Sequence, residues 1–178
     1  MKKIVMFLSA FVPMYILVLT KTVLDLINGN IELNITNVLV IIFLSIFVVL
    51  GFVGLFFINK GKSNIIHIKV EDVDNVTGQY FFGYFSLFVL LAVNFDLSKI
   101  CEIVVFLLIN TMIGIVYTHN NLYFINPLLN ILGFDICNIT YKSGGEDVCI
   151  KVFTNRKISI GDSISINTMF NSNFCKLM

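Results

Sequence analysis

The sequence predicts an α-helical membrane protein: four transmembrane helices followed by a small all-β cytoplasmic domain of the SH3 or OB size class. The first observation is composition, since the 178 residues are 57% hydrophobic and 13% charged, with a mean hydropathy of +0.92. Globular proteins average about 25% charged residues. The second is a change of period, from long apolar runs to short alternating stretches. We therefore divide the chain into a transmembrane domain (1–120), a juxtamembrane linker (121–133) and a β domain (134–178).

Four apolar runs are candidate spans, because crossing about 30 Å of hydrocarbon requires roughly 20 apolar residues. The first follows Lys2 and Lys3 but shows no small-residue cleavage pattern, so we interpret it as an uncleaved helix that contains Pro13. The second run carries no charge. The third and fourth are separated by a short loop and should form an antiparallel hairpin. The predicted spans are residues 4–20, 38–58, 80–95 and 101–117.

Lysine and arginine are distributed unevenly among the predicted loops. Of the 12 such residues, only Lys21 and Lys99 fall in the first and third loops; the others lie in the N-terminal segment, the second loop and the C-terminal region. The positive-inside rule then places both termini in the cytoplasm. A net charge of +1 gives no reason to expect direct binding of nucleic acid.

The stretch "NNLYFINPLLNILGFDICNI" decides how the membrane part ends. Its apolar portion is about half the length of a span, and Pro127 with its neighbouring asparagines would leave polar groups unsatisfied in lipid. Asn126 as N-cap, Pro127 at the first helical position and Gly133 as the stop predict a short helix. We interpret this helix as the joint between the bundle and the β domain. Its apolar residues are Leu128, Leu129, Ile131 and Leu132.

The residues after Phe134 show β-branched alternation. The stretches "FDICNITY", "DVCIKVFT", "KISI" and "SISINTM" are separated by turn formers that include Gly144, Gly145 and Gly161. Such a module is more often an interaction domain than an enzyme. The extended segment 64–75, "NIIHIKVEDVDN", lies on the same predicted side and can add a strand to the sheet.

No catalytic, metal or cofactor motif is recognisable. His67 and His119 stand outside any cluster at metal-ligand spacing, and the four cysteines form no C-x-x-C pair. Cys137, Cys149 and Cys175 would face a reducing compartment, where we expect small buried hydrophobes and no disulfides. We predict no enzyme activity, metal or cofactor.

A few small or polar residues stand out within the spans. Asn110 and Thr111 lie near the middle of the fourth span, where we expect an interhelical hydrogen bond before a conduction pathway. Gly51 and Gly54 in the second span offer a surface for close helix assembly.

The order of these elements resembles a known family. "HIKVEDVDN" leads into "GQYFFGYFSLF", and "LYFINPLLNILGFDICNI" is followed by "RKISIGDSISI". This arrangement is similar to the membrane subunit of the bacterial Kiwa anti-phage system, the KwaA family, over most of the chain; its motif-like core is N-P-L-L-x-x-x-G-F. The resemblance implies a homo-oligomeric inner-membrane sensor of phage attack that works with a cytoplasmic DNA-binding effector. We expect the oligomer to be a tetramer, and the resemblance supplies no catalytic residues.

Our leading hypothesis is a non-enzymatic sensor and scaffold in antiviral defence, with the lipid bilayer, further copies of itself and a cytoplasmic effector as partners. One alternative is a small oligomeric channel lined by the third and fourth spans, with Asp96 and Glu102 at its mouth. The other is a membrane-anchored OB-like accessory protein of the kind that accompanies membrane proteases.

Overall fold

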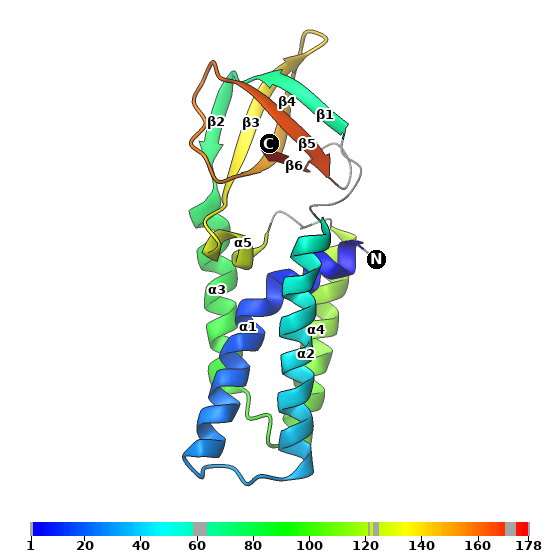
Figure 1. Cartoon of the computed structure of the whole chain (residues 1–178), viewed down its shortest axis with the longest axis vertical. Coiled ribbons are helices and arrows are strands. Elements are labelled where there is room, and N and C mark those ends of the chain that lie inside the picture. Colours follow the sequence, from blue (N-terminus) through cyan, green and yellow to red (C-terminus); the bar gives the residue numbers. More distant parts are fainter. Residues whose placement is uncertain (1, 59–63, 121, 123–124, 170–173, 178) are drawn as a thin grey trace. The chain divides into compact units, whose positions relative to one another are not determined.

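The computed structural model describes residues 2–58, 64–120, 122, 125–169 and 174–177 (Figure 1). It contains two compact units. The helical unit comprises Met1–Asn59 and Phe82–Leu128, and the β unit comprises Lys60–Phe81 and Leu129–Met178. The β unit thus includes residues 60–81 in addition to the 134–178 segment suggested by the alternation.

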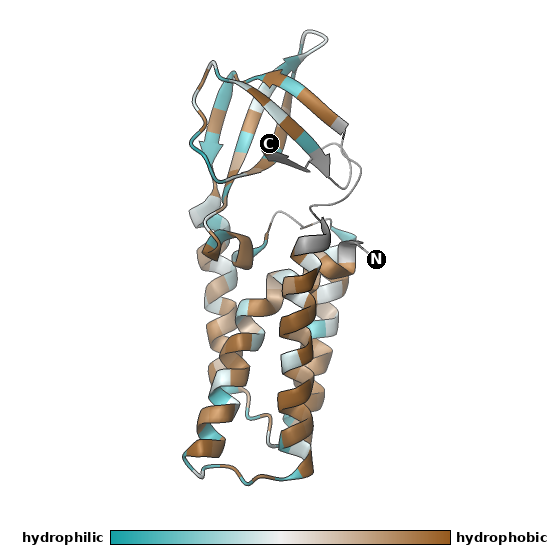
Figure 2. Ribbon diagram, in the orientation of Figure 1, coloured by the Kyte–Doolittle hydropathy of each residue, from teal (hydrophilic) through white to brown (hydrophobic). Residues whose placement is uncertain are grey.

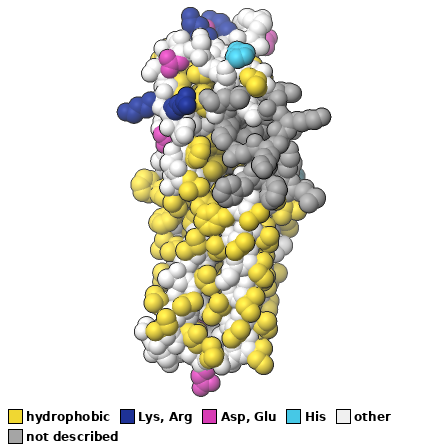
Figure 3. Space-filling view, in the orientation of Figure 1, with side chains coloured by type: hydrophobic (Ala, Val, Ile, Leu, Met, Phe, Trp, Pro, Cys, Tyr) yellow, Lys and Arg dark blue, Asp and Glu magenta, His cyan; other side chains and the backbone are white. Residues whose placement is uncertain are grey.

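Four long helices account for most of the helical unit. They are α1 (Lys2–Ile27), α2 (Ile35–Ile58), α3 (Thr77–Asn94), whose first turn belongs to the β unit, and α4 (Ile100–His119). Each contains one predicted span almost completely, and α1 continues through Pro13. Apolar residues surround the helices along most of their length (Figure 2), and hydrophobic side chains cover the visible face of this unit (Figure 3). Helices that are apolar all round are typical of a membrane environment.

Among the described residues, three helices are long and apolar enough to cross a membrane: Ile4–Ile27, Ile35–Leu55 and Ile100–His119. The helix α3 is not one of these three, because its first turns contain polar and small residues such as Gln79 and Gly83. The prediction of four spans is therefore supported for three helices. A crossing by α3 stays a prediction.

The helix α1 is the centre of the helical unit. Half of the residues in its most apolar 18-residue stretch are buried inside the protein, compared with 22% of the corresponding stretch for α2 and 17% for α4. Its aromatic side chains contact each of the other three long helices, in the tilted and edge-on arrangements that aromatic pairs prefer. The pairs are Phe11–Phe88 on α3 (5.0 Å between ring centroids), Phe7–Tyr117 on α4 (5.6 Å) and Tyr15–Phe47 on α2 (5.4 Å).

Six strands form one sheet in the β unit, in the order β1-β5-β6-β4-β3-β2. All neighbouring pairs are antiparallel except β4 and β6, which are parallel. The strands are β1 (Asn64–Lys69), β2 (Asp72–Asn75), β3 (Asp135–Ser143), β4 (Glu146–Thr154), β5 (Ser163–Met169) and β6 (Phe174–Leu177).

The sheet closes into a barrel because its two edge strands, β1 and β2, belong to one bent segment (Figure 1). At the bend, the N–H of Val70 donates to the carbonyl of Asp162 next to β5, and the N–H of Glu71 donates to the carbonyl of Thr140 in β3. Counted as one strand, this segment gives a five-stranded barrel of the OB type. Its interior is filled by Ile68, Val70, Cys137, Ile139, Ile150, Val152 and Ile166.

Two expectations about the β domain were wrong in detail. The stretch "KISI" is not a strand but part of the loop between β4 and β5, where the N–H of Ser159 donates to the Asp162 carboxylate at 2.8 Å. Only Ile158 of this stretch packs against the core. Cys149 is exposed and not buried, because its register partner is Thr140 on the outer side of the barrel, whereas Cys137 pairs with Val152 inside. The side chain of Cys175 lies outside the described residues.

We expect alkylation to distinguish these two cysteines. Burial raises the pKa of the Cys137 thiol, and Asp135 and Asp74 raise it further, so the reactive thiolate is both rare and inaccessible. In variants that retain one cysteine, a maleimide at pH 8 should label Cys149 rapidly and Cys137 only after denaturation. Equal rates in the folded protein would contradict the inward orientation of Cys137.

Candidate functional site

The start of α5 (Pro127–Ile131) is held within the helical unit by buried polar contacts. Asn126 caps this helix as predicted: its Oδ1 accepts from the N–H of Leu128 at 3.1 Å, and Pro127 occupies the first helical position. The other end of the same amide, Nδ2, donates to the hydroxyl of Ser9 in α1 at 2.8 Å. Asn126 and Leu128 are both buried. A single amide therefore shapes α5 and joins it to α1.

Ser9 makes two hydrogen bonds through its side-chain hydroxyl. The Ser9 hydroxyl donates to the carbonyl of Met6 at 2.8 Å while it accepts from Asn126. Tyr117 of α4 adds a second bond, from its hydroxyl to the carbonyl of Ile125 at 3.2 Å. We define the bundle anchor as Ser9, Tyr117, Ile125, Asn126 and Leu128.

A second set of contacts, within the β unit, joins the start of α3 to the start of β3. The side chain of Asn75 accepts from the N–H of Thr77 at 3.0 Å and so caps α3. The hydroxyl of Thr77 accepts from the N–H of Ile136 at 2.8 Å, and the N–H of Val76 donates to the Ile136 carbonyl at 3.0 Å. We define the barrel anchor as Asn75, Val76, Thr77 and Ile136.

The end of α5 forms a Schellman motif within the β unit. Gly133 has a φ of +84°, as its predicted role as a stop requires. Its N–H donates to the carbonyl of Asn130, and the N–H of Phe134 donates to the carbonyl of Leu129, both at 3.0 Å. Leu132 is exposed and Leu129 only half-buried. Full burial of the apolar residues of this helix is therefore limited to its first turn.

Asn110 makes the interhelical hydrogen bond that its position suggested. The hydroxyl of Tyr15 in α1 donates to Asn110 Oδ1 at 3.3 Å, and Asn110 Nδ2 donates to the carbonyl of Phe106 at 2.9 Å. Thr111, by contrast, is exposed and donates only to the carbonyl of Leu107 in its own helix. The polar side chain of Asn110 thus fixes α4 to α1 within one chain.

Gly51 and Gly54 allow α2 to approach α1 closely. A β-carbon at Gly51 would lie 2.2 Å from the Val12 side chain and 3.1 Å from the carbonyl oxygen of Leu8. One at Gly54 would lie 2.3 Å from the Val5 side chain. Both glycines therefore serve packing within the chain.

The two carboxylates considered for a pore mouth make local bonds in the α3–α4 turn. The Glu102 carboxylate accepts from the N–H of Asp96, and the hydroxyl of Ser98 donates to Asp96 Oδ1 at 2.6 Å. The Ser98 hydrogen bond, followed by the charge of Lys99, lowers the pKa of Asp96 below its usual range. These contacts give both carboxylates a role in shaping the turn.

Sequence reasoning missed three side chains: Ser9, Thr77 and Lys21. Lys21 lies inside α1, and its ammonium donates to the carbonyls of Val93 (2.9 Å) and Phe95 (2.8 Å) at the end of α3. A cation is favourable there because of the helix dipole. The sequence feature that could have pointed to the role of Lys21 was a single charge at the end of an apolar run.

Metal-ligating residues are scattered in the described part of the chain. No group of three or more His, Cys, Asp or Glu side chains in it is arranged to hold a metal ion. His67 lies 2.8 Å (Nδ1 to Oγ) from Ser165 on the neighbouring strand.

Comparison with known proteins places the chain in a family. The family model described as anti-phage protein KwaA matches residues 2–175, which span both units. No curated protein and no solved structure matches the sequence. Since the match covers nearly the whole chain, this protein belongs to the KwaA family of anti-phage proteins.

Proposed function

We propose that this KwaA-family protein is a non-enzymatic sensor and scaffold in the bacterial inner membrane, which controls a cytoplasmic DNA-binding effector. The observation that carries the proposal is the pair of anchors. In the helical unit, the bundle anchor ties the start of α5 to α1 and α4. In the β unit, the barrel anchor ties the start of α3 to β3. Two described helices, α3 and α5, run from one unit into the other. Each of them begins at one of these anchors, which contain buried or partly buried polar contacts.

The proposed mechanism couples packing in the bundle to the barrel. A disturbance of the envelope during phage attack shifts α1 or α4 and so changes the contacts of Ser9 and Tyr117. Because α5 starts in the helical unit and ends in the β unit, it passes this shift on to the barrel, which holds the effector. Two states with different affinity for the effector are required for such coupling. The protein works as a homo-oligomer, with a tetramer as the expected form.

A reporter-fusion experiment tests the membrane topology. Fusions after Asn30 and Phe95 should report the outer side, and fusions after Ser63 and Met178 the cytoplasm, as expected for four spans with both termini inside. If α4 crosses and α3 does not, β2 and β3 would lie on opposite sides of the membrane and could not pair as they do in the sheet. A C-terminal fusion that reports the outer side would exclude a cytoplasmic effector.

The Thr77→Val variant tests the barrel anchor in function. Valine keeps the shape of threonine but leaves the Ile136 N–H without its acceptor, which typically costs about 1 to 3 kcal/mol for a buried group. We expect normal insertion and reduced protection against phage in a plating assay. Thr77→Ser, which retains the hydroxyl, is the matched control and should protect like the wild type. Full protection by Thr77→Val would show that this contact is not needed.

The channel alternative is tested by Asn110→Leu. Because Asn110 bonds to Tyr15 within the chain, we expect its loss to weaken the packing of α4 against α1 and to leave ion flux through liposomes unchanged. Flux that is present in the wild type and absent in the variant would favour a channel.

A further inference from the structure

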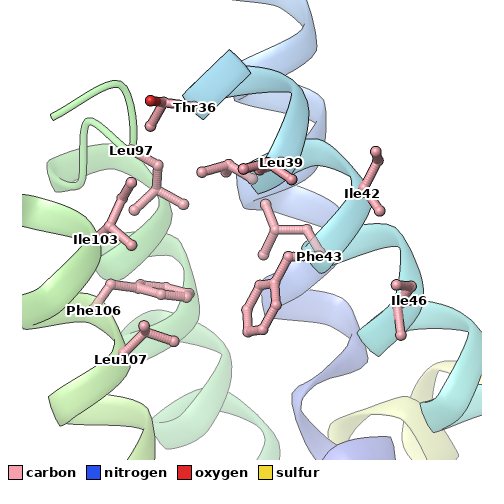
Figure 4. A pocket seen from close by; sticks show the side chains of 11 residues that line it. Thr36, Leu39, Ile42, Phe43, Ile46, Leu97, Ile103, Phe106 and Leu107 are labelled. Carbon is pink, nitrogen blue, oxygen red and sulfur yellow. The ribbon is translucent and has the colours of Figure 1, made fainter. Parts of the chain in front are cut away.

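An apolar groove of about 470 Å³ lies between α2 and α4 in the helical unit (Figure 4). The rings of Phe43 and Phe106 project into it from the two helices, and Leu97 of the α3–α4 turn lines one end. Its volume is within the usual range of ligand sites. The main lining residues are Leu39, Phe43, Ile46, Leu97, Phe106 and Leu107.

The length of the groove matches one leaflet of a bilayer. It extends along α2 from Thr36, at the start of the helix, to Ile46. Ten residues of α-helix rise about 15 Å, which is half of a hydrocarbon core about 30 Å thick. The groove therefore runs from the expected headgroup level to the middle of the membrane, as one fatty acyl chain does.

An acyl chain is a single row of methylene groups, much thinner than a helix, which is about 10 Å wide with its side chains. It can therefore follow the groove between α2 and α4 along its whole length.

The charges near one end of the groove favour a headgroup that carries both signs. The turn that contains Leu97 also carries Asp96, Lys99 and Glu102; Lys99 Nζ lies 3.1 Å from Asp96 Oδ2 and 3.5 Å from Glu102 Oε1. All three side chains are partly or largely exposed. The two carboxylates can accept hydrogen bonds from an ammonium group, while Lys99 can approach a phosphate. A purely anionic headgroup would meet a net negative charge here.

We propose that this groove is a phospholipid site, which holds one acyl chain of a zwitterionic, amine-bearing phospholipid with its headgroup at the Asp96–Lys99–Glu102 turn. The inference rests on the membrane placement given under the proposed function. It adds a lipid as a structural ligand of the bundle, at a surface formed by α2 and α4.

Tryptophan fluorescence can test the site, because the chain contains no tryptophan. Leu107→Trp places one reporter in the groove, and Leu108→Trp is the matched control on the same helix, 58% exposed and outside the lining. The full chain in detergent is titrated with phosphatidylethanolamine brominated on its acyl chains, which quenches tryptophan on contact. We expect the emission at position 107 to fall and to saturate at one lipid per chain, and that at position 108 to fall only gradually without saturation.

The headgroup is tested by the same titration with brominated phosphatidylglycerol, which should require a severalfold higher concentration. Equal, unsaturated quenching at both positions would overturn the site. Equal affinity for the two lipids would overturn the assignment of the headgroup. An unquenched reporter at position 107, together with disulfide cross-linking between chains that carry Leu107→Cys, would show that a second copy fills the groove instead. Phage protection is measured separately, so a failed lipid site leaves the sensor proposal testable.

Discussion

Replacing Gly51 with alanine is expected to lower the free energy of unfolding of the helical unit by about 1 to 3 kcal/mol, the usual cost of overpacking. The added methyl group would lie 2.2 Å from the Val12 side chain, so one of the two must move. The Leu8 carbonyl oxygen is also only 3.1 Å away, and it belongs to the backbone of α1. This second contact can be relieved only if α2 moves away from α1, which is costly. The thermal unfolding midpoint of the purified chain in detergent measures the effect.

Gly83→Ala is the matched control for this change. Gly83 also lies in a long helix of the helical unit, but a β-carbon there would meet no atom within 4 Å. Alanine in an open helical position should be neutral or stabilise by about 0.5 to 1 kcal/mol. If both variants unfold at the same temperature, the close approach of α1 and α2 is not a source of stability.

Replacing Gly133 with valine is expected to abolish phage protection while membrane insertion stays normal. The φ of +84° at this position is strained for a β-branched residue, at a cost of about 1 to 3 kcal/mol. The Schellman bonds of Gly133 and Phe134 would break, and the chain would enter β3 at a different angle. Plating efficiency of phage measures protection, and membrane fractionation measures insertion.

Gly133→Asn separates backbone strain from the loss of a glycine as such. Asparagine tolerates positive φ better than other side chains of its size, so this variant should retain most of the protection. A Gly133→Val variant that protects fully would show that the geometry at the end of α5 is not required for signalling.

The elements with local signals could be predicted from the sequence. The four long helices follow from uninterrupted apolar runs, and the short helix α5 follows from Asn126, Pro127 and Gly133, which act on their immediate neighbours. The hydrogen-bonding need of Asn110 was also evident, because a polar side chain inside an apolar span requires a partner.

The anchors could not be predicted, because their partners are far apart in the chain. Ser9 and Asn126 are 117 positions apart, and Thr77 and Ile136 are 59 apart. A serine in an apolar helix and a threonine after a strand are common, and neither reveals a distant partner. The prediction of a strand at "KISI" was wrong for a different reason, because alternation over only four residues is too short to establish strand pairing.

The claim that the anchors control the effector is tested most directly by measuring how much DNA-binding effector is recovered with the full chain, purified from cells in which it protects against phage. The comparison is between the wild type, Leu128→Asp, which places a charge at the buried start of α5, and the volume-conserving Leu128→Met. We predict stoichiometric recovery with the wild type and Leu128→Met, and less than about a tenth of it with Leu128→Asp although this variant still inserts; a tenfold loss corresponds to about 1.4 kcal/mol. Equal recovery with Leu128→Asp, or no DNA-binding protein recovered with the wild type, would contradict the account.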